Sequence, residues 1–151
     1  MNKKEAFRTF NIEVSNPRQS WSGINKEEGI VAITIWTDER KWCREGKFYR
    51  TQVPDTGLQF WQNSYGNRER KEIIKYCIEN LNSRFWVIFC KPKREIHGEA
   101  REAEWFKPNT KLMYKITSFD EETGIFSSQG DPSTQDKYDE IFLQQLSLIH
   151  I

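Results

Sequence analysis

Two short apolar runs, Ile30–Trp36 and Phe85–Cys90, constrain the fold of this 151-residue chain more than any other feature. Within the first run only Thr34 is polar. A strand without a polar face is stable only where both of its faces are covered, as in the middle of a sheet. Between the runs, apolar side chains recur at the spacing of one buried helix face, at Ile73, Ile74, Cys77, Ile78 and Leu81. The sequence therefore predicts two central strands bridged by a helix.

Helices are expected at both ends of the chain as well. Apolar spacing favours a short first helix over Lys3–Phe10 and a closing helix that starts near Tyr138 and reaches Ile149. Asn67 has the side chain of a good N-cap for the central helix.

Further strands surround the central pair. Residues 21–25 and 30–37 predict a hairpin, with Gly29 supplying a positive-φ turn position. Strands are also expected over 47–53, over 112–117 and from Ile125 onward, after a turn at 120–124. Residues 105–109 predict another turn, and 38–64 a long, largely irregular connection. This order indicates a single α+β domain over residues 1–151, with a curved, mainly antiparallel sheet or a partly open β-barrel, one central helix and a helix at each end.

Charge is divided unevenly along the chain. Residues 1–115 carry 22 Lys and Arg against 15 Asp and Glu, whereas residues 116–151 carry one Lys against seven acidic residues. A basic body with an acidic end can bind a polyanion on one face. No apolar run reaches the length of a membrane span, so we expect no membrane partner.

The cysteines and histidines suggest neither a metal nor a redox site. Cys43, Cys77 and Cys90 are odd in number and widely spaced, which is typical of reduced thiols in a cytoplasmic protein. His97 and His150 are the only histidines, and no pair of Cys or His has ligand spacing. We therefore predict no metal, no cofactor and no catalytic residue.

An aromatic and basic segment between residues 16 and 65 is the candidate binding region. Flat aromatic faces beside cations suit a planar ligand tethered to negative charge, such as a nucleotide. The candidate ligand-binding residues are Trp21, Trp36, Asp38, Trp42 and Trp61. The candidate phosphate-contacting residues are Arg18, Arg40, Lys41, Arg44, Arg68, Lys71 and Lys75. Asp38 follows an indole, where a carboxylate can accept a hydrogen bond from the exocyclic amine of a base.

Each of these residues has a structural alternative. Trp21 and Trp36 can be core residues, and the stripe Arg68, Lys71 and Lys75 can be a solvated helix face. The favoured function is a nucleic-acid-binding module that reads an unpaired or modified base. The alternatives are a binding protein for a small planar metabolite or for a protein partner, including a second copy of the chain.

A third alternative is a nuclease. Pro54-Asp55 followed by Glu69-Arg70-Lys71 resembles the signature of restriction-type nucleases, which use two carboxylates to hold a divalent metal. In this chain, however, Glu69 and Lys71 open the predicted helix, where side chains two residues apart point in different directions.

Three short runs resemble a family of small uncharacterised bacterial proteins, some of them carried on mobile DNA such as integron cassettes. The runs are residues 16–23 (NPRQSWSG), 34–38 (TIWTD) and 66–72 (GNRERKE). The resemblance spans roughly residues 12 to 127 and implies no particular activity or catalytic residue. The strand order is also similar to that of PUA-like barrels, some of which read modified bases in an aromatic pocket. That similarity carries no functional residue across.

Overall fold

A computed structural model describes residues 1–94 and 101–147. Seven strands form one open sheet in the order β1-β2-β5-β6-β7-β4-β3. The strands are β1 (Ser22–Asn25), β2 (Ile30–Trp36), β3 (Arg40–Cys43), β4 (Phe48–Gln52), β5 (Arg84–Pro92), β6 (Ala103–Phe119) and β7 (Phe126–Gly130). Only β2 and β5 are parallel, and all other neighbours are antiparallel. The α+β class and the mainly antiparallel sheet are confirmed.

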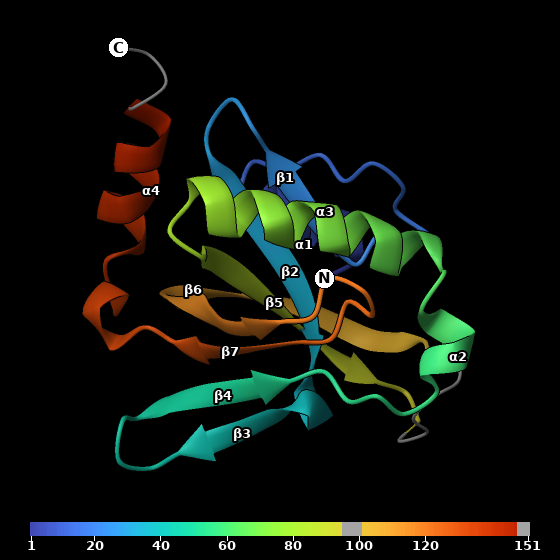
Figure 1. Cartoon of the computed structure of the whole chain (residues 1–151). Helices are drawn as coiled ribbons and strands as arrows, with labels where there is room; N and C mark the ends of the chain where they lie inside the picture. The colour runs from blue at the N-terminus through green and yellow to red at the C-terminus, as the bar shows by residue number, and fades with distance from the viewer. Residues whose placement is uncertain (95–100, 148–151) are drawn as a thin grey trace.

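Three helices flank this sheet, as the sequence predicts (Figure 1). They are α1 (Lys3–Arg8), α3 (Tyr65–Asn80) and α4 (Tyr138–Ser147). The connections also contain the short helix α2 (Leu58–Trp61) and two 3-10 turns, η1 (Thr37–Glu39) and η2 (Pro132–Thr134). Helix α3 lies in the connection from β2 to β5, which allows these two strands to run parallel.

Both faces of β2 and β5 are buried, because alternate side chains enter two separate cores. Val31 and Val87 belong to the core that also holds Ile73 and Ile74 of α3. Ala32 and Trp86 belong to the other core, which α1 covers and against which α4 packs; its members include Phe7 and Phe10, with Tyr138 and Ile141 packed on it. The continuous apolar character of these strands is thus explained by a layer on each side.

The hairpin of β1 and β2 turns at Gly29, whose φ is +65°. A residue with a side chain is strained at this backbone conformation, which accounts for glycine at the position. The predicted hairpin and its turn residue are confirmed.

The central helix starts earlier than predicted. Ser64 is the N-cap, and its side chain accepts a hydrogen bond from the backbone N–H of Asn67. Asn67 is buried in the first turn, and its Nδ2 donates to the carbonyls of Gln62 and Thr123 at 2.8 and 2.9 Å. Its amide therefore ties two loops to the helix instead of capping it. Ile78, expected on the buried face, is 40% exposed.

Two segments expected to be irregular are strands. Arg40–Cys43 pairs with β4 within the predicted long connection. Residues 105–109, expected to form a turn, lie within β6 and pair with β5. Within β6, only Tyr114–Phe119 pairs with β7, so residues 105–109 have a strand neighbour on one side, where Pro108 is tolerated.

Candidate functional site

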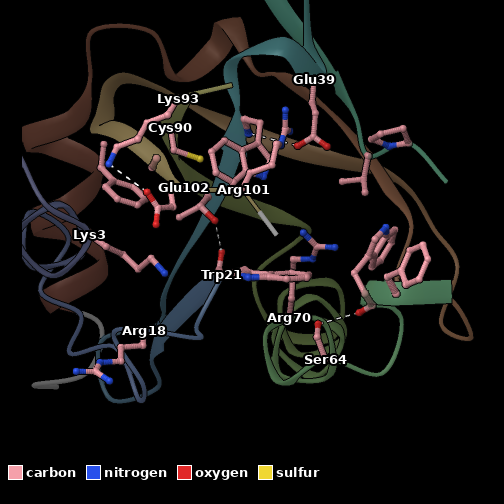
Figure 2. Close-up of a pocket in the computed structure, with 18 of the residues that line it drawn as sticks. Lys3, Arg18, Trp21, Glu39, Ser64, Arg70, Cys90, Lys93, Arg101 and Glu102 are labelled. Carbon is pink, nitrogen blue, oxygen red and sulfur yellow. Dashed lines mark hydrogen bonds and ion pairs between the residues drawn. The ribbon is translucent and has the colours of Figure 1, made fainter. Parts of the chain in front are cut away.

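A cavity of about 760 Å³ opens where the end of β2 meets the first turns of α3 (Figure 2). Its walls also come from the loop before β1, helix α2, the start of β6 and the end of β5. The aromatic lining residues are Trp21, Trp36, Phe60, Trp61 and Phe106. The charged lining residues are Lys3, Arg18, Glu39, Arg70, Lys93, Arg101 and Glu102. Five of these seven are basic, so the cavity combines aromatic faces with an excess of positive charge.

Trp21 forms one wall and lies against the first turn of α3. A Cβ atom at Gly66 would approach the Trp21 indole to 2.5 Å, so the ring rests on helix backbone that has no side chain. The ring meets Trp61 edge to face, with centroids 6.3 Å apart. Trp61 is held in turn by its indole N–H, which donates to the carbonyl of Thr56 at 3.0 Å. Trp21 and Trp61, which are 40 positions apart in the sequence, therefore form one continuous aromatic surface.

Arg70 is the most deeply buried cation of this wall, with an exposed fraction of 6%. Its guanidinium carbon lies 4.9 Å from the ring centroid of Trp21 and 5.2 Å from that of Phe126. Nη2 donates to Oδ1 of Asn67 at 3.2 Å, but Nε is buried and has no hydrogen-bond partner among the described residues. Burial lowers the pKa of Arg70 to about 10, and the nearby Glu39 opposes that shift. The group therefore stays cationic at neutral pH with a donor unused.

Glu39 approaches the same region from η1. Its Oε1 accepts a hydrogen bond from the backbone N–H of Trp36 at 3.3 Å. Burial raises the pKa of Glu39 to about 7, although the positive charge of Arg70 works in the opposite direction. A carboxyl group with such a pKa changes charge near neutral pH and can accept or donate a hydrogen bond.

Trp36 and Arg101 form a second aromatic and cationic layer. The Arg101 guanidinium lies 4.4 Å from the Trp36 ring centroid. Asp38 holds it there through two hydrogen bonds, from Nη1 at 2.6 Å and from Nη2 at 3.2 Å. Only 9% of the Arg101 side chain is exposed. Asp38 thus positions an arginine beside the cavity, which differs from the direct reading role expected for it.

The opposite wall is basic and more exposed. Lys3 enters from α1, and burial lowers its pKa. Its ammonium group lies 5.8 Å from the ring centroid of Phe106. Lys93 pairs with Glu102 at 3.2 Å, and Arg18 is exposed in the loop before β1. Figure 2 shows Lys3, Arg18 and Lys93 on the side of the cavity away from Arg70.

The cavity brings together four of the predicted site residues, which are Trp21, Trp36, Trp61 and Arg18. Trp42 lies elsewhere, on β3, with 52% of its surface exposed and its ring 4.9 Å from that of Tyr49. Arg40 is also on β3, where its guanidinium stacks on Tyr49 and Phe89. These two residues belong to a separate surface, the β3–β4 hairpin.

The remaining predicted phosphate contacts are spread over two elements. Lys41 and Arg44 are exposed on the β3–β4 hairpin. Arg68, Lys71 and Lys75 lie along α3, where an acidic turn engages two of them. Lys71 donates to the carbonyl of Glu122 at 3.3 Å, and Lys75 pairs with Glu121 at 4.0 Å. This stripe therefore contacts the chain's own acidic segment.

Sequence reasoning missed several lining residues, namely Lys3, Glu39, Phe60, Arg70, Lys93, Arg101, Glu102 and Phe106. Arg70 had a usable signal, because it precedes Ile73 and Ile74 by three and four residues and so shares their buried helix face. Lys3 and Arg101 had none. Each reaches the cavity through long-range packing. Near Lys3, for example, the backbone N–H of Phe106 in β6 donates to the carbonyl of Met1 at 3.2 Å.

Two of the nuclease-like residues, Glu69 and Lys71, are engaged by other groups in the part of the chain that is described. Glu69 accepts hydrogen bonds from the hydroxyls of Ser15 and Tyr65, and Lys71 contacts Glu122. Within residues 1–94 and 101–147, no group of three or more His, Cys, Asp or Glu could hold a metal ion. His97 and His150 lie outside the described residues.

Comparisons with protein-family models, with curated proteins and with solved structures found no match to this chain. The resemblances to small bacterial proteins and to PUA-like barrels therefore stay predictions. Of the helices within the described ranges, none has both the length and the apolar character needed to cross a bilayer.

Proposed function

We propose that this protein binds nucleic acid by taking one unpaired or modified base into the cavity beside Trp21 and Arg70. The observation that carries the proposal is the convergence of three tryptophans and five cationic side chains on a single cavity. Bases stack on aromatic rings and on guanidinium planes, whereas phosphates require cations, and this cavity offers both kinds of group.

The size of the cavity favours a single base over a duplex. Small-molecule sites typically enclose roughly 300–1,000 Å³, and the cavity's volume of about 760 Å³ falls within that range. The Trp36–Arg101 and Trp21–Arg70 layers, at 4.4 and 4.9 Å, are held in place before any ligand arrives. Such preorganised groups reduce the entropy lost on binding.

The basic wall of the cavity supports binding of a phosphate group of the ligand. Lys3, Arg18 and Lys93 lie on its exposed side, where a sugar–phosphate backbone can remain in water while the base is enclosed. Lys41 and Arg50 provide a second cationic pair on the β3–β4 hairpin, directly opposite each other in the sheet register. Like charges placed opposite each other are destabilising, and an anionic partner relieves that repulsion.

The second candidate is a free planar metabolite that carries an anionic group. One observation favours it: the acidic turn at Glu121 and Glu122 already engages Lys71 and Lys75. The basic stripe of α3 is then less available to follow a nucleic-acid backbone, and the affinity would come from the cavity alone.

A tryptophan-fluorescence titration with short single-stranded and duplex oligonucleotides at two salt concentrations tests the proposal. We expect saturable quenching by the single strand that weakens at high salt, by about 0.7 log units in affinity per log of salt for each phosphate contacted. Duplex DNA of equal length serves as the control and should bind more weakly. Saturable binding of mononucleotides without any gain from the longer strand would favour the metabolite instead.

A further inference from the structure

Two charged groups of opposite sign line the cavity, the buried Arg70 and the half-buried Glu39, and neither uses all of its hydrogen-bonding atoms. Glu39 uses Oε1 for the N–H of Trp36, and among the residues that the structure describes no group donates to its Oε2. Arg70 uses Nη2 for Asn67, and among the described residues no group accepts a hydrogen bond from Nη1, which is not one of the fully buried atoms. The two groups come from different elements, η1 and α3, and each influences the pKa of the other. Both residues line the cavity, which therefore presents an open acceptor and an open donor.

Both unused positions are open to a ligand, so the hydrogen bonds that they can still make indicate what that ligand carries. A carboxylate accepts hydrogen bonds only, and a guanidinium donates only. A ligand that satisfies both must present donors on one part of its edge and acceptors on the adjacent part. An aromatic ring of this kind would also use the indole and guanidinium layers described above.

Among the four common bases, guanine fits this requirement best. It carries two adjacent donors, N1–H and the N2 amine, followed by the acceptors O6 and N7. Adenine and cytosine each place a ring-nitrogen acceptor beside their amine, where it would repel a carboxylate. Uracil has a single donor flanked by two carbonyl oxygens.

We propose that the cavity selects guanine, with Glu39 accepting from N1–H and the N2 amine and with Arg70 donating to O6 or N7. This inference rests on the proposed function and specifies its ligand. It applies equally to a guanine that is unpaired in nucleic acid and to a free guanine nucleotide, because both sources present the same edge.

Calorimetric titration with GMP, AMP, CMP and UMP at pH 8 tests the selection, since all four carry the same phosphate. We expect GMP to bind at least tenfold more tightly than the other three. Inosine 5′-monophosphate should fall between GMP and AMP, because it keeps N1–H, O6 and N7 but lacks the N2 amine. Equal affinity for all four nucleotides would overturn guanine selection and leave base binding in place.

The variant Glu39→Gln examines the acceptor directly. Glutamine keeps an oxygen for the Trp36 N–H but replaces one carboxylate oxygen with a donor. We expect the preference for GMP over AMP to fall below about threefold, because GMP loses an acceptor for its two donors while the glutamine amide no longer repels the ring nitrogen of adenine. Glu104→Gln is the control, because Glu104 is exposed on β6 and does not line the cavity. An unchanged preference in Glu39→Gln would overturn the assignment to Glu39.

A matched pair of oligonucleotides separates the two sources of guanine. A short single strand with one central G among U residues is compared with the same strand carrying A at that position. Tighter binding of the G strand than of GMP identifies nucleic acid as the source, and tighter binding of GMP identifies the free nucleotide. If no nucleotide and no strand binds, both the guanine inference and the proposed function fail.

Discussion

The guanidinium of Arg70 lies 4.9 Å from the ring centroid of Trp21, over an indole that rests on the backbone of Gly66. Gly66 and Arg70 are one helical turn apart on α3, so the helix supplies both the support for the ring and the cation above it. A cation placed over an indole in a desolvated site is worth on the order of 2 kcal/mol. The geometry of the cavity wall therefore depends on the start of α3.

Replacing Gly66 with alanine tests this dependence. The new Cβ would lie 2.5 Å from Trp21 and 2.7 Å from the carbonyl of Gln19. Overpacking typically costs about 1–3 kcal/mol, more than the roughly 1 kcal/mol that alanine gains in helix propensity. Two contacts this short place the cost near the upper end of that range, so we expect a net loss of about 2 kcal/mol in the free energy of unfolding, measured by urea denaturation. Glu79→Ala, at an exposed position of the same helix, should change it by less than about 0.5 kcal/mol. A Gly66→Ala protein as stable as the parent would show that Trp21 moves freely.

The carboxyl of Glu39 makes stability depend on pH. Its pKa is raised from 4.5 to about 7, so between these values the folded protein holds a proton that the unfolded chain releases. The free energy of unfolding should fall as the pH rises through this window, by roughly 1–3 kcal/mol. The stabilisation is complete below pH 4.5 and lost above 7. Urea denaturation at pH 5 and pH 8 measures the change, and Glu39→Gln should abolish most of it. A parent and variant with parallel pH profiles would contradict the buried location of this carboxyl.

Phe60 offers a test of binding that leaves the core intact. It lines the cavity from α2, yet 76% of its surface is exposed, so truncation removes little packing. Stacking of a base on an aromatic side chain contributes about 1–3 kcal/mol. We expect Phe60→Ala to weaken single-strand binding by about fivefold to a hundredfold in fluorescence titrations. Leu143→Ala is the matched control on α4, where the leucine is 62% exposed and outside the cavity. Equal effects of the two substitutions would place the ligand elsewhere.

Lys3 and Lys4 allow a test of the phosphate contact within one helix. Both are basic residues of α1, but only Lys3 lines the cavity. If Lys3 neutralises one phosphate of a bound strand, Lys3→Ala should reduce the slope of log affinity against log salt by about 0.7. The slope should stay unchanged in Lys4→Ala, which also controls for the loss of net charge. A common change in both variants would indicate a diffuse electrostatic effect instead of a contact.

Helices and strands were predictable where local pattern and burial agreed. The runs that became β2 and β5 are apolar along their whole length, and the two cores cover them on both faces. Prediction was wrong where a long-range partner decided the outcome. Residues 105–109 carry a proline and read as a turn, but pairing with β5 extends them into a strand. Asn67 has the chemistry of an N-cap, but the carbonyls of Gln62 and Thr123 recruit its amide.

In the candidate site, too, residues with a local sequence signal could be predicted, and residues placed by long-range contacts could not. Trp21, Trp36 and Trp61 could be selected from the sequence because their type and their basic neighbours indicate stacking. Phe60 and Trp61 belong to α2, which the sequence did not distinguish from a loop. Arg101 reaches Trp36 across 65 positions of the chain, and no local pattern encodes a contact of that kind.

The α+β class, the two central strands and the aromatic and basic character of residues 16–65 are readable from the sequence, because hydrophobic periodicity and residue chemistry are local properties. Which charged groups come together in the cavity is a matter of tertiary packing. Glu39 and Arg70 lie 31 positions apart, and their altered pKa values arise from desolvation that exists only once β2, η1 and α3 have packed. Burial is a property of the assembled fold, and the chemistry of this cavity depends on it.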